Sequence, residues 1–191
     1  MPVGGEEAMA FNGEVRDAAR DRAADAFATC LERALDAQYR LAVLILGDRD
    51  EAEDALHDAL EAAWRARGSL RDPERFDAWF GRIVTNTCRD RAWRRRRGPI
   101  AIADLPEREA PDEFAGLADR YLLRRALREL DIDHRTVLVL RYYADLSVED
   151  IAACTGVRAG TVKSRLHYGL RALRAALEAT ARREPEREVS R

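Results

Sequence analysis

The sequence contains few residues that break helices or cross-link chains. Among 191 residues there are 6 prolines, 11 glycines and 3 cysteines. The cysteines (Cys30, Cys88 and Cys154) are odd in number and far apart, and no CxxC pair occurs. This pattern excludes a disulfide framework and a cysteine-based zinc site, and it indicates small buried residues in a reducing compartment.

Long hydrophobic segments are also absent. No apolar run approaches the roughly 20 residues of a transmembrane helix, and the N-terminus has no signal-peptide core. We therefore expect a soluble, cytoplasmic protein with no membrane insertion.

The residues that are abundant favour an all-α protein of one or two small domains, because alanine, leucine, arginine and glutamate dominate. The formal net charge is only −2, but the charges are segregated. Residues 48–61 hold seven acids against one arginine, whereas residues 89–97 hold six arginines against one aspartate. Opposed patches of this kind indicate two different partners.

The most informative stretch is residues 146–177, which is predicted to form two helices joined by a tight turn. Ser147 stands at an N-cap position and Asp150 completes a capping-box pattern. Gly156 can adopt the positive φ that such a turn needs. Five residues of the second helix recur at helical spacing and predict one apolar stripe: Val162, Leu166, Leu170, Leu173 and Leu177.

The other side of this second helix is polar and basic, with no acidic residue from Arg158 to Arg174. The pattern is typical of a helix-turn-helix, whose second helix lies in a DNA major groove. An amphipathic helical hairpin with a solvated basic face is the alternative that the residues alone leave open.

Three further helices are predicted over residues 21–46, 50–67 and 73–97. The acids of the second repel one another along the helix, so we expect a basic partner, although an ordinary solvated face is the alternative. The third begins at Asp72-Pro73 and ends in an arginine-rich run that suits a nucleic-acid backbone. A basic helix end that complements the macrodipole is the alternative there.

The domain prediction follows from these helices. Two small helical domains, residues 21–97 and 120–178, are joined by a flexible linker over residues 98–119, which holds three of the six prolines. Helices at 120–130 and 134–143 pack on the helix-turn-helix. Residues 1–20 are expected to be a disordered tail and residues 179–191 a charged, unstructured tail.

Three blocks in this order resemble the bacterial sigma-70 family in its compact extracytoplasmic-function (ECF, group 4) form. DRDEAEDALHDALEAAWRA is similar to the acidic region 2 helix that binds the polymerase clamp. RFDAWFGRIVTNTCRDRAWRRRR is similar to the helix that recognises and opens the −10 element. LRRALRELDIDHRTVLVLRYYADLSVEDIAACTGVRAGTVKSRLHYGLRALR is similar to region 4, which recognises the −35 element.

The resemblance implies a transcription initiation factor that recruits core RNA polymerase and assists −10 melting without covalent chemistry. It implies contacts with the clamp of the β′ subunit and the flap of the β subunit, and with promoter DNA, duplex at −35 and single-stranded at −10. An anti-sigma factor is a further implied partner. No cofactor or metal is expected.

The resemblance also implies three sets of site residues. The polymerase set is Asp50, Glu53, Asp54, His57, Asp58 and Glu61. The −10 set is Ser69, Arg71, Phe76, Trp79, Arg82, Asn86 and Arg89, with Asn86 against a flipped base. The −35 set is Arg158, Thr161, Lys163, Ser164, Arg165, His167, Tyr168 and Arg171, in which Lys163, Ser164, His167 and Tyr168 face bases.

Some positions depart from the family pattern. His57 and Leu60 replace the usual glutamine and aromatic residue, and Tyr168 replaces a common arginine. Tyrosine cannot form the bidentate contact that arginine makes with guanine, so the −35 preference of this chain is left open.

Two other functional classes compete with this interpretation. A di-iron enzyme would need paired carboxylate-x-x-His motifs, and the two candidates, Asp54-x-x-His57 and Asp131-x-x-His134, fall in different predicted domains. A dimeric helix-turn-helix regulator is the stronger competitor. It would explain residues 120–178 but not the acidic helix or the aromatic and basic helix at 73–97.

Overall fold

The computed structural model describes residues 5–97 and 117–188, with side chains placed from 24 to 96, from 119 to 180 and at Arg182. The described ranges are helical throughout apart from short connections, which confirms the predicted all-α class. In chain order the elements are α1 (Gly5–Leu46), α2 (Arg49–Ala66), the 3₁₀ turns η1 (Arg67–Ser69) and η2 (Pro73–Arg75), α3 (Phe76–Arg97), α4 (Leu117–Arg128), α5 (Ile132–Tyr142), α6 (Val148–Thr155) and α7 (Ala159–Glu188).

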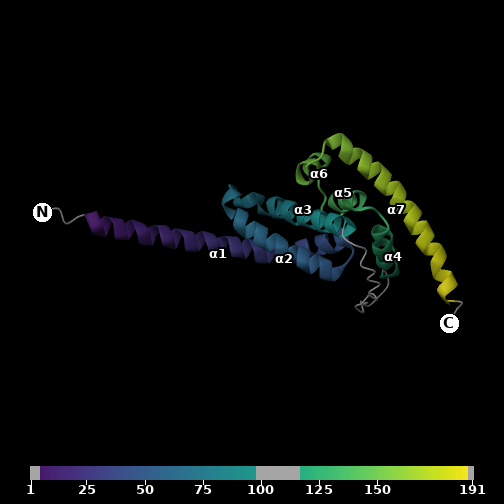
Figure 1. The fold of residues 1–191 in the computed structure, drawn as a ribbon, viewed down its shortest axis with the longest axis horizontal. Helices are drawn as coiled ribbons and strands as arrows, with labels where there is room; N and C mark the ends of the chain where they lie inside the picture. The colour runs from purple at the N-terminus through teal and green to yellow at the C-terminus, as the bar shows by residue number, and fades with distance from the viewer. Residues whose placement is uncertain (1–4, 98–116, 189–191) are drawn as a thin grey trace.

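The first half of the molecule is a bundle of α1, α2 and α3 (Figure 1). The inner face of α2 carries four completely buried alanines, which let the helices approach closely: Ala52, Ala55, Ala59 and Ala63. From α3, Phe76 and Phe80 fill the space between the helices, and Phe27 of α1 meets the Phe76 ring edge-on at 5.6 Å.

The second half consists of α4–α7, with α5 as its central helix. Every residue of α5 from Arg135 to Leu140 is buried, so this helix is covered on all sides. Gly169 of α7 lies against α5, where an added Cβ would be 3.3 Å from His134 and Leu138. The predicted stripe on α7 is only partly buried, because Val162 is fully buried but Leu170 is 43% exposed.

The two halves pack against each other, a contact that the prediction of two small domains joined by a flexible linker did not include. Helix α1 contacts α5, and α3 contacts both α5 and α6. Figure 1 shows α5 and α6 lying over the end of α3. Buried residues of both halves form one continuous hydrophobic cluster. Of the predicted linker, residues 98–116 lie outside the described residues, and residues 117–119 belong to α4.

The helices at the two ends are longer than predicted. Residues 5–20 belong to α1 and residues 179–188 to α7, where tails without structure were expected. The segments lack an apolar period, but they are rich in alanine, glutamate and arginine, which have high helix propensity. Once core packing has nucleated a helix, such residues extend it at little free-energy cost. No described helix has the length and hydropathy needed to cross a membrane.

Candidate promoter and polymerase interfaces

The helix-turn-helix forms as the sequence predicts. Ser147 is the N-cap of α6, and its hydroxyl accepts a hydrogen bond from the Asp150 amide at 3.0 Å. The helix ends at Gly156, whose φ of +70° is left-handed, and the Gly156 amide donates to the Ala152 carbonyl. These contacts fix the direction in which α7 leaves the turn.

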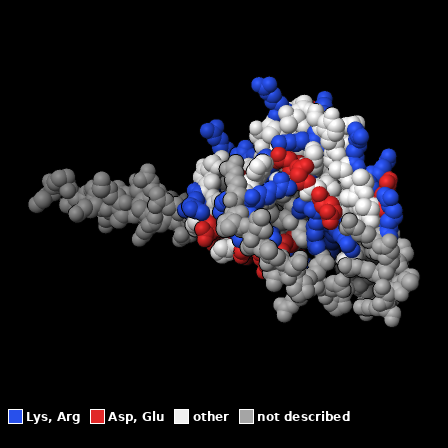
Figure 2. Space-filling view, turned by 45° about the vertical axis from the view of Figure 1, so that its right-hand side comes forward, with Lys and Arg blue, Asp and Glu red and all other residues white. Residues whose placement is uncertain are grey.

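The predicted −35 residues form a polar surface on the first turns of α7, and all but one are exposed. The exposed members are Arg158, Thr161, Lys163, Ser164, His167, Tyr168 and Arg171. The rings of His167 and Tyr168 meet edge-on at 5.2 Å, and Tyr168 is 56% exposed. Figure 2 shows basic side chains at several places on the visible face of the described residues. This surface suits a duplex phosphate backbone.

Arg165 is the exception, because it is committed to a contact within the protein. Its Nη2 donates to Oδ2 of Asp133 on α5 at 2.6 Å. The other oxygen of Asp133 accepts from Nη2 of Arg89 on α3 at 3.2 Å, and Nη1 of Arg89 donates to the Thr155 carbonyl at 2.9 Å. One predicted −10 residue and one predicted −35 residue therefore share a single carboxylate.

The loop before α3 is built from two 3₁₀ turns and forms the outer part of the predicted −10 set. Asp72 caps η2 through a hydrogen bond from the Glu74 amide at 3.0 Å, with Pro73 at the first position as expected. The indole of Trp79 donates to the Ser69 hydroxyl at 3.3 Å, and that hydroxyl donates to the Ala66 carbonyl. Ser69 and Trp79 thus lie together at the rim of the loop.

Other members of the −10 set lie along α3 in different environments. Arg71 and Arg82 are exposed, and Asn86 is half-buried. Phe76 differs from the prediction, because it is only 1% exposed and packs among the aromatic rings of the bundle. Because Phe76 is buried in the core, it has no surface that a base could contact. Its role is to support the loop from within the core.

The acidic face of α2 is partly neutralised inside the protein, contrary to our expectation that its repulsion is unrelieved. Arg91 of α3 donates to Glu51 at 2.6 Å, to Asp58 at 3.0 Å and to Asp54. The hydrogen bond with Glu51 is the main cause that raises the pKa of Arg91 above its usual range. The predicted polymerase residues Asp54 and Asp58 are therefore already bound to a cation.

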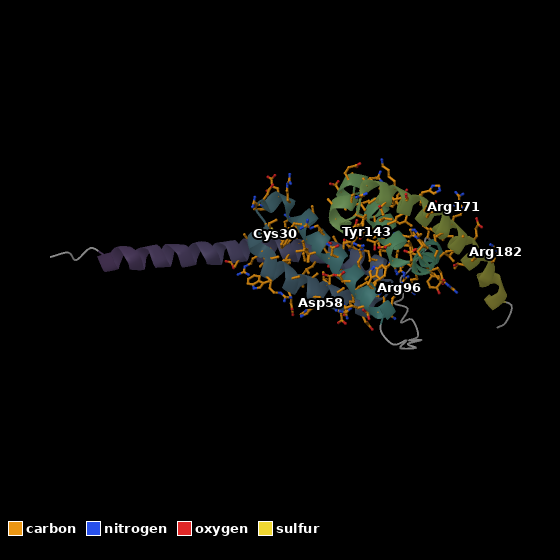
Figure 3. The ribbon with its side chains drawn as sticks, turned by 45° about the horizontal axis from the view of Figure 1, so that its top comes forward. Cys30, Asp58, Arg96, Tyr143, Arg171 and Arg182 are labelled. Carbon is orange, nitrogen blue, oxygen red and sulfur yellow. The ribbon has the colours of Figure 1, made fainter. Side chains whose placement is uncertain are left out.

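The remaining predicted polymerase residues lie on the solvent side of α2. Asp50, Glu53, His57 and Glu61 are exposed. His57 and Glu61 are 3.7 Å apart, and Glu61 also pairs with Arg65. Figure 3 places Asp58 on α2 well away from Arg171 on α7, so the acidic and basic surfaces are separate.

The cysteines are free thiols, as expected, and two of them are buried. Burial raises the pKa of Cys88 to about 12. Burial also raises the pKa of Cys154, which belongs to the same hydrophobic cluster as Val84 and Cys88 of α3. Cys154 therefore lies where α6 meets the first half.

Sequence reasoning missed three arginines that organise the structure: Arg91, Arg89 as an interdomain contact, and Arg135. The guanidinium of Arg135 is buried and donates to four backbone carbonyls, those of Ile45, Leu46, Arg128 and Leu130. The available signal was a charged residue at an apolar helical position of α5, because such a residue is buried only when it is paired.

Comparisons with known protein families find a match for each half of the chain. Residues 30–98 match the family model of sigma-70 region 2, and residues 126–175 match that of sigma-70 region 4. The chain is 37% identical over 145 residues to the ECF RNA polymerase sigma factor SigL of Mycobacterium tuberculosis, which covers 73% of this chain and 82% of that protein. It is 32% identical over 151 residues to the RNA polymerase sigma factor SigV of Bacillus subtilis, covering 76% and 87%.

Two solved structures share the fold. The sigma factor RpoE in complex with the anti-sigma factor NepR, from Bartonella quintana, has a TM-score of 0.63 and 27% identity, and the match covers 80% of this chain and 96% of that one. CnrH in complex with the cytosolic domain of CnrY has a TM-score of 0.58 and 26% identity, covering 82% and 95%.

Proposed function

The chain belongs to the sigma-70 family and to its ECF group, and from this premise we propose how its surfaces divide the work of transcription initiation. It is a sigma factor that binds core RNA polymerase and directs promoter-specific initiation. The observation that carries the residue assignments is the separation of the acidic surface on α2 from the basic surface on α7. The protein acts by binding, in the cytoplasm where promoter and polymerase are, and carries out no covalent chemistry.

The solvent side of α2 is proposed as the polymerase contact. Asp50, Glu53, His57 and Glu61 project from it, whereas Asp54 and Asp58 lie beside them, each paired with the guanidinium of Arg91. A basic surface on the β′ clamp complements this charge. In this assignment Arg91 holds α2 against α3 and keeps the exposed acids in register.

The test of this contact removes two acids that Arg91 does not hold. The double variant Asp50→Asn, Glu61→Gln is expected to weaken binding to core polymerase by about tenfold, measured by fluorescence anisotropy at low salt. The matched control, Glu129→Gln with Glu149→Gln, removes two exposed charges from the second half. Equal affinities of the two double variants would remove the polymerase contact from this face.

The exposed polar side of α7 is proposed as the −35 contact, and the loop with α3 as the −10 contact. Lys163, Ser164, His167 and Tyr168 face bases, while Arg158, Thr161, Arg165 and Arg171 hold phosphates. Around the −10 element, Ser69 and Trp79 form the rim of a pocket, Asn86 holds a flipped base, and Arg71, Arg82 and Arg89 lie along the backbone. Phe76 keeps a supporting role in the core.

Lys163→Ala is expected to reduce −35-dependent transcription while polymerase binding stays unchanged. One base or phosphate contact is worth about 1–3 kcal/mol, so initiation should fall by about tenfold or more in a run-off assay. Arg182→Ala is the matched control, because Arg182 lies exposed at the far end of the same helix (Figure 3). A loss of holoenzyme assembly in Lys163→Ala would contradict this role.

A second protein surface is proposed at an apolar groove between α1, α4, α5 and α7. The groove has a volume of about 790 Å³ and contains the exposed side chains of Leu123, Tyr142, Tyr143 and Leu170, with Arg40 and Arg124 at its edge. Exposed apolar patches of this kind mark protein contacts. We assign it to an anti-sigma factor, since the similar sigma factor RpoE was solved in complex with the anti-sigma factor NepR.

A further inference from the structure

A single carboxylate on α5 joins the two halves of the molecule by bonding to one arginine from each of the two helices proposed to bind DNA, α3 and α7. Asp133 accepts hydrogen bonds from Arg89 of α3 at 3.2 Å and from Arg165 of α7 at 2.6 Å. Arg89 also donates to the carbonyl of Thr155, the last residue of α6. We refer to Arg89, Asp133, Arg165 and the Thr155 carbonyl as the interdomain cluster.

The interdomain cluster is shielded from solvent. The side chains of Arg89, Asp133 and Arg165 are 16%, 18% and 22% exposed. Ion pairs in such positions are screened less by salt than surface pairs and hold a defined geometry. Both oxygens of Asp133 are used, one by each guanidinium, so neither arginine can leave without breaking a charge-assisted hydrogen bond.

The contacts around the cluster close α3 against the helix-turn-helix. Helix α3 packs on α5 and α6, and the buried Cys154 of α6 belongs to the same hydrophobic cluster as Val84 and Cys88 of α3. Asn86 lies one turn before Arg89 on the same helix and is half-buried. A DNA strand that contacts this part of α3 must therefore displace α5 and α6 from it.

A DNA phosphate has the same chemistry as the carboxylate of Asp133. Both are anionic groups whose oxygens accept from the planar guanidinium fork. A phosphate and Asp133 cannot hold the same Nη donors at one time, so the two must compete for Arg89 and Arg165.

We propose that Asp133 holds the free sigma factor closed and withholds one DNA-binding arginine of each half until promoter phosphates replace it. The inference rests on the proposed function, which gives Arg89 to the −10 contact and Arg165 to the −35 contact. Opening then exchanges one intramolecular carboxylate for phosphates at two promoter elements, and the free protein binds DNA weakly on its own.

The first test measures opening through the thiol of Cys154. Full-length protein carrying Cys30→Ser and Cys88→Ala leaves Cys154 as its single thiol, and its reaction with 5,5′-dithiobis(2-nitrobenzoic acid) reports how often α3 leaves α6. Asp133→Asn keeps the shape of the side chain and removes its charge, and we expect labelling about tenfold faster than in the parent.

The matched control is Asp145→Asn, which removes the same charge from the same half. Asp145 is exposed and has a φ of +51°, a conformation that asparagine tolerates. Arg89→Lys provides a second variant, because an ammonium keeps the charge but cannot bind Asp133 and the Thr155 carbonyl with a fixed fork. Thermal unfolding verifies that each variant is folded. Labelling of Asp133→Asn and Arg89→Lys at the rate of Asp145→Asn would overturn the proposal.

The second test measures DNA binding by the free protein. The probe is a mixed-sequence duplex of two helical turns at low salt, and we expect Asp133→Asn to bind it about tenfold more tightly than Asp145→Asn does. Faster thiol labelling without tighter binding would overturn the claim that Asp133 withholds the arginines. Neither test uses polymerase or a promoter, so a failure here leaves the sigma-factor function standing, and a failure of polymerase-dependent transcription leaves the labelling result intact.

Discussion

Arg135 is the residue whose replacement should cost this fold the most for a single charged side chain. It is 8% exposed, and Nη1 donates to the carbonyls of Ile45 and Leu46 at 3.0 and 3.1 Å. Nη2 donates to those of Arg128 and Leu130 at 3.1 and 2.9 Å. Arg135 therefore caps the C-terminal ends of α1 and α4 together and joins the two halves.

The magnitude follows from what the guanidinium leaves behind. Burial lowers the pKa of Arg135 to about 10, so the side chain is still charged at neutral pH, and four helix-end carbonyls stabilise it. Arg135→Met keeps most of the packing volume but removes every donor. Leaving the buried carbonyls without their charged donor should lower the free energy of unfolding by about 3–5 kcal/mol. This is a large part of the stability of a small domain.

Arg141→Met is the matched control, since it makes the same change on the same helix. Arg141 donates to one carbonyl, that of Leu146 at 2.8 Å, and its loss should cost about 1.5 kcal/mol. Urea unfolding followed by far-ultraviolet circular dichroism gives both free energies. If Arg135→Met lost no more stability than Arg141→Met, the four-carbonyl cap would not stabilise the fold.

Two further predictions concern the core and the α1–α2 turn. Gly47 has a φ of +75°, and an added Cβ would lie 2.7 Å from Cγ of Arg128, so Gly47→Ala should lower the free energy of unfolding by about 1–3 kcal/mol. Gly68→Ala is the control and should change this free energy little, because an added Cβ there would have nothing within 4 Å. Equal melting temperatures of the two variants would contradict the prediction. Burial raises the pKa of Cys88 from 9.0 to about 12, so the stability contributed by the neutral thiol is complete below the unfolded pKa and is lost as pH rises toward the folded one. At about pH 10.5 the wild type should have lost about 2 kcal/mol more than Cys88→Ala, and parallel stability curves in urea unfolding would refute the assignment.

Local features of the fold were predictable from the sequence because neighbouring residues determine them. Ser147, Asp150 and Gly156 act within a few positions of one another, and the structure confirms the cap and the turn that they predict. Asp72 and Pro73 likewise begin the third predicted helix, although its first turn is 3₁₀. The alanines of α2 recur at helical spacing in the sequence, and all four of them on its inner face are buried.

Contacts between distant residues were beyond such reasoning. Arg91 lies 40 positions from Glu51, and Arg89 lies 44 positions from Asp133. Helical periodicity gives the face that a side chain occupies, but it does not give the helix that will cover that face. The acidic helix was therefore judged to need an external cation, and Phe76 was assigned to DNA although the aromatic cluster encloses it.

The site residues show the same difference between features that depend on neighbouring residues and features that depend on distant contacts. The polar face of α7 was predicted from spacing and from the absence of acids, whereas the resemblance implied its eight named residues, of which seven are exposed. Arg165 is different because Asp133 lies next to it in space. Whether a predicted DNA contact is available in the free protein thus depends on tertiary packing.

The central claim is that this chain confers promoter specificity on core RNA polymerase. Run-off transcription on a pool of promoter fragments, with core polymerase and the protein each added or omitted, tests it most directly. We expect specific transcripts only when both are present, with start sites that align to two common upstream elements. Tight duplex binding by the protein alone, with no transcripts in the complete reaction, would contradict the account and favour an ordinary helix-turn-helix regulator.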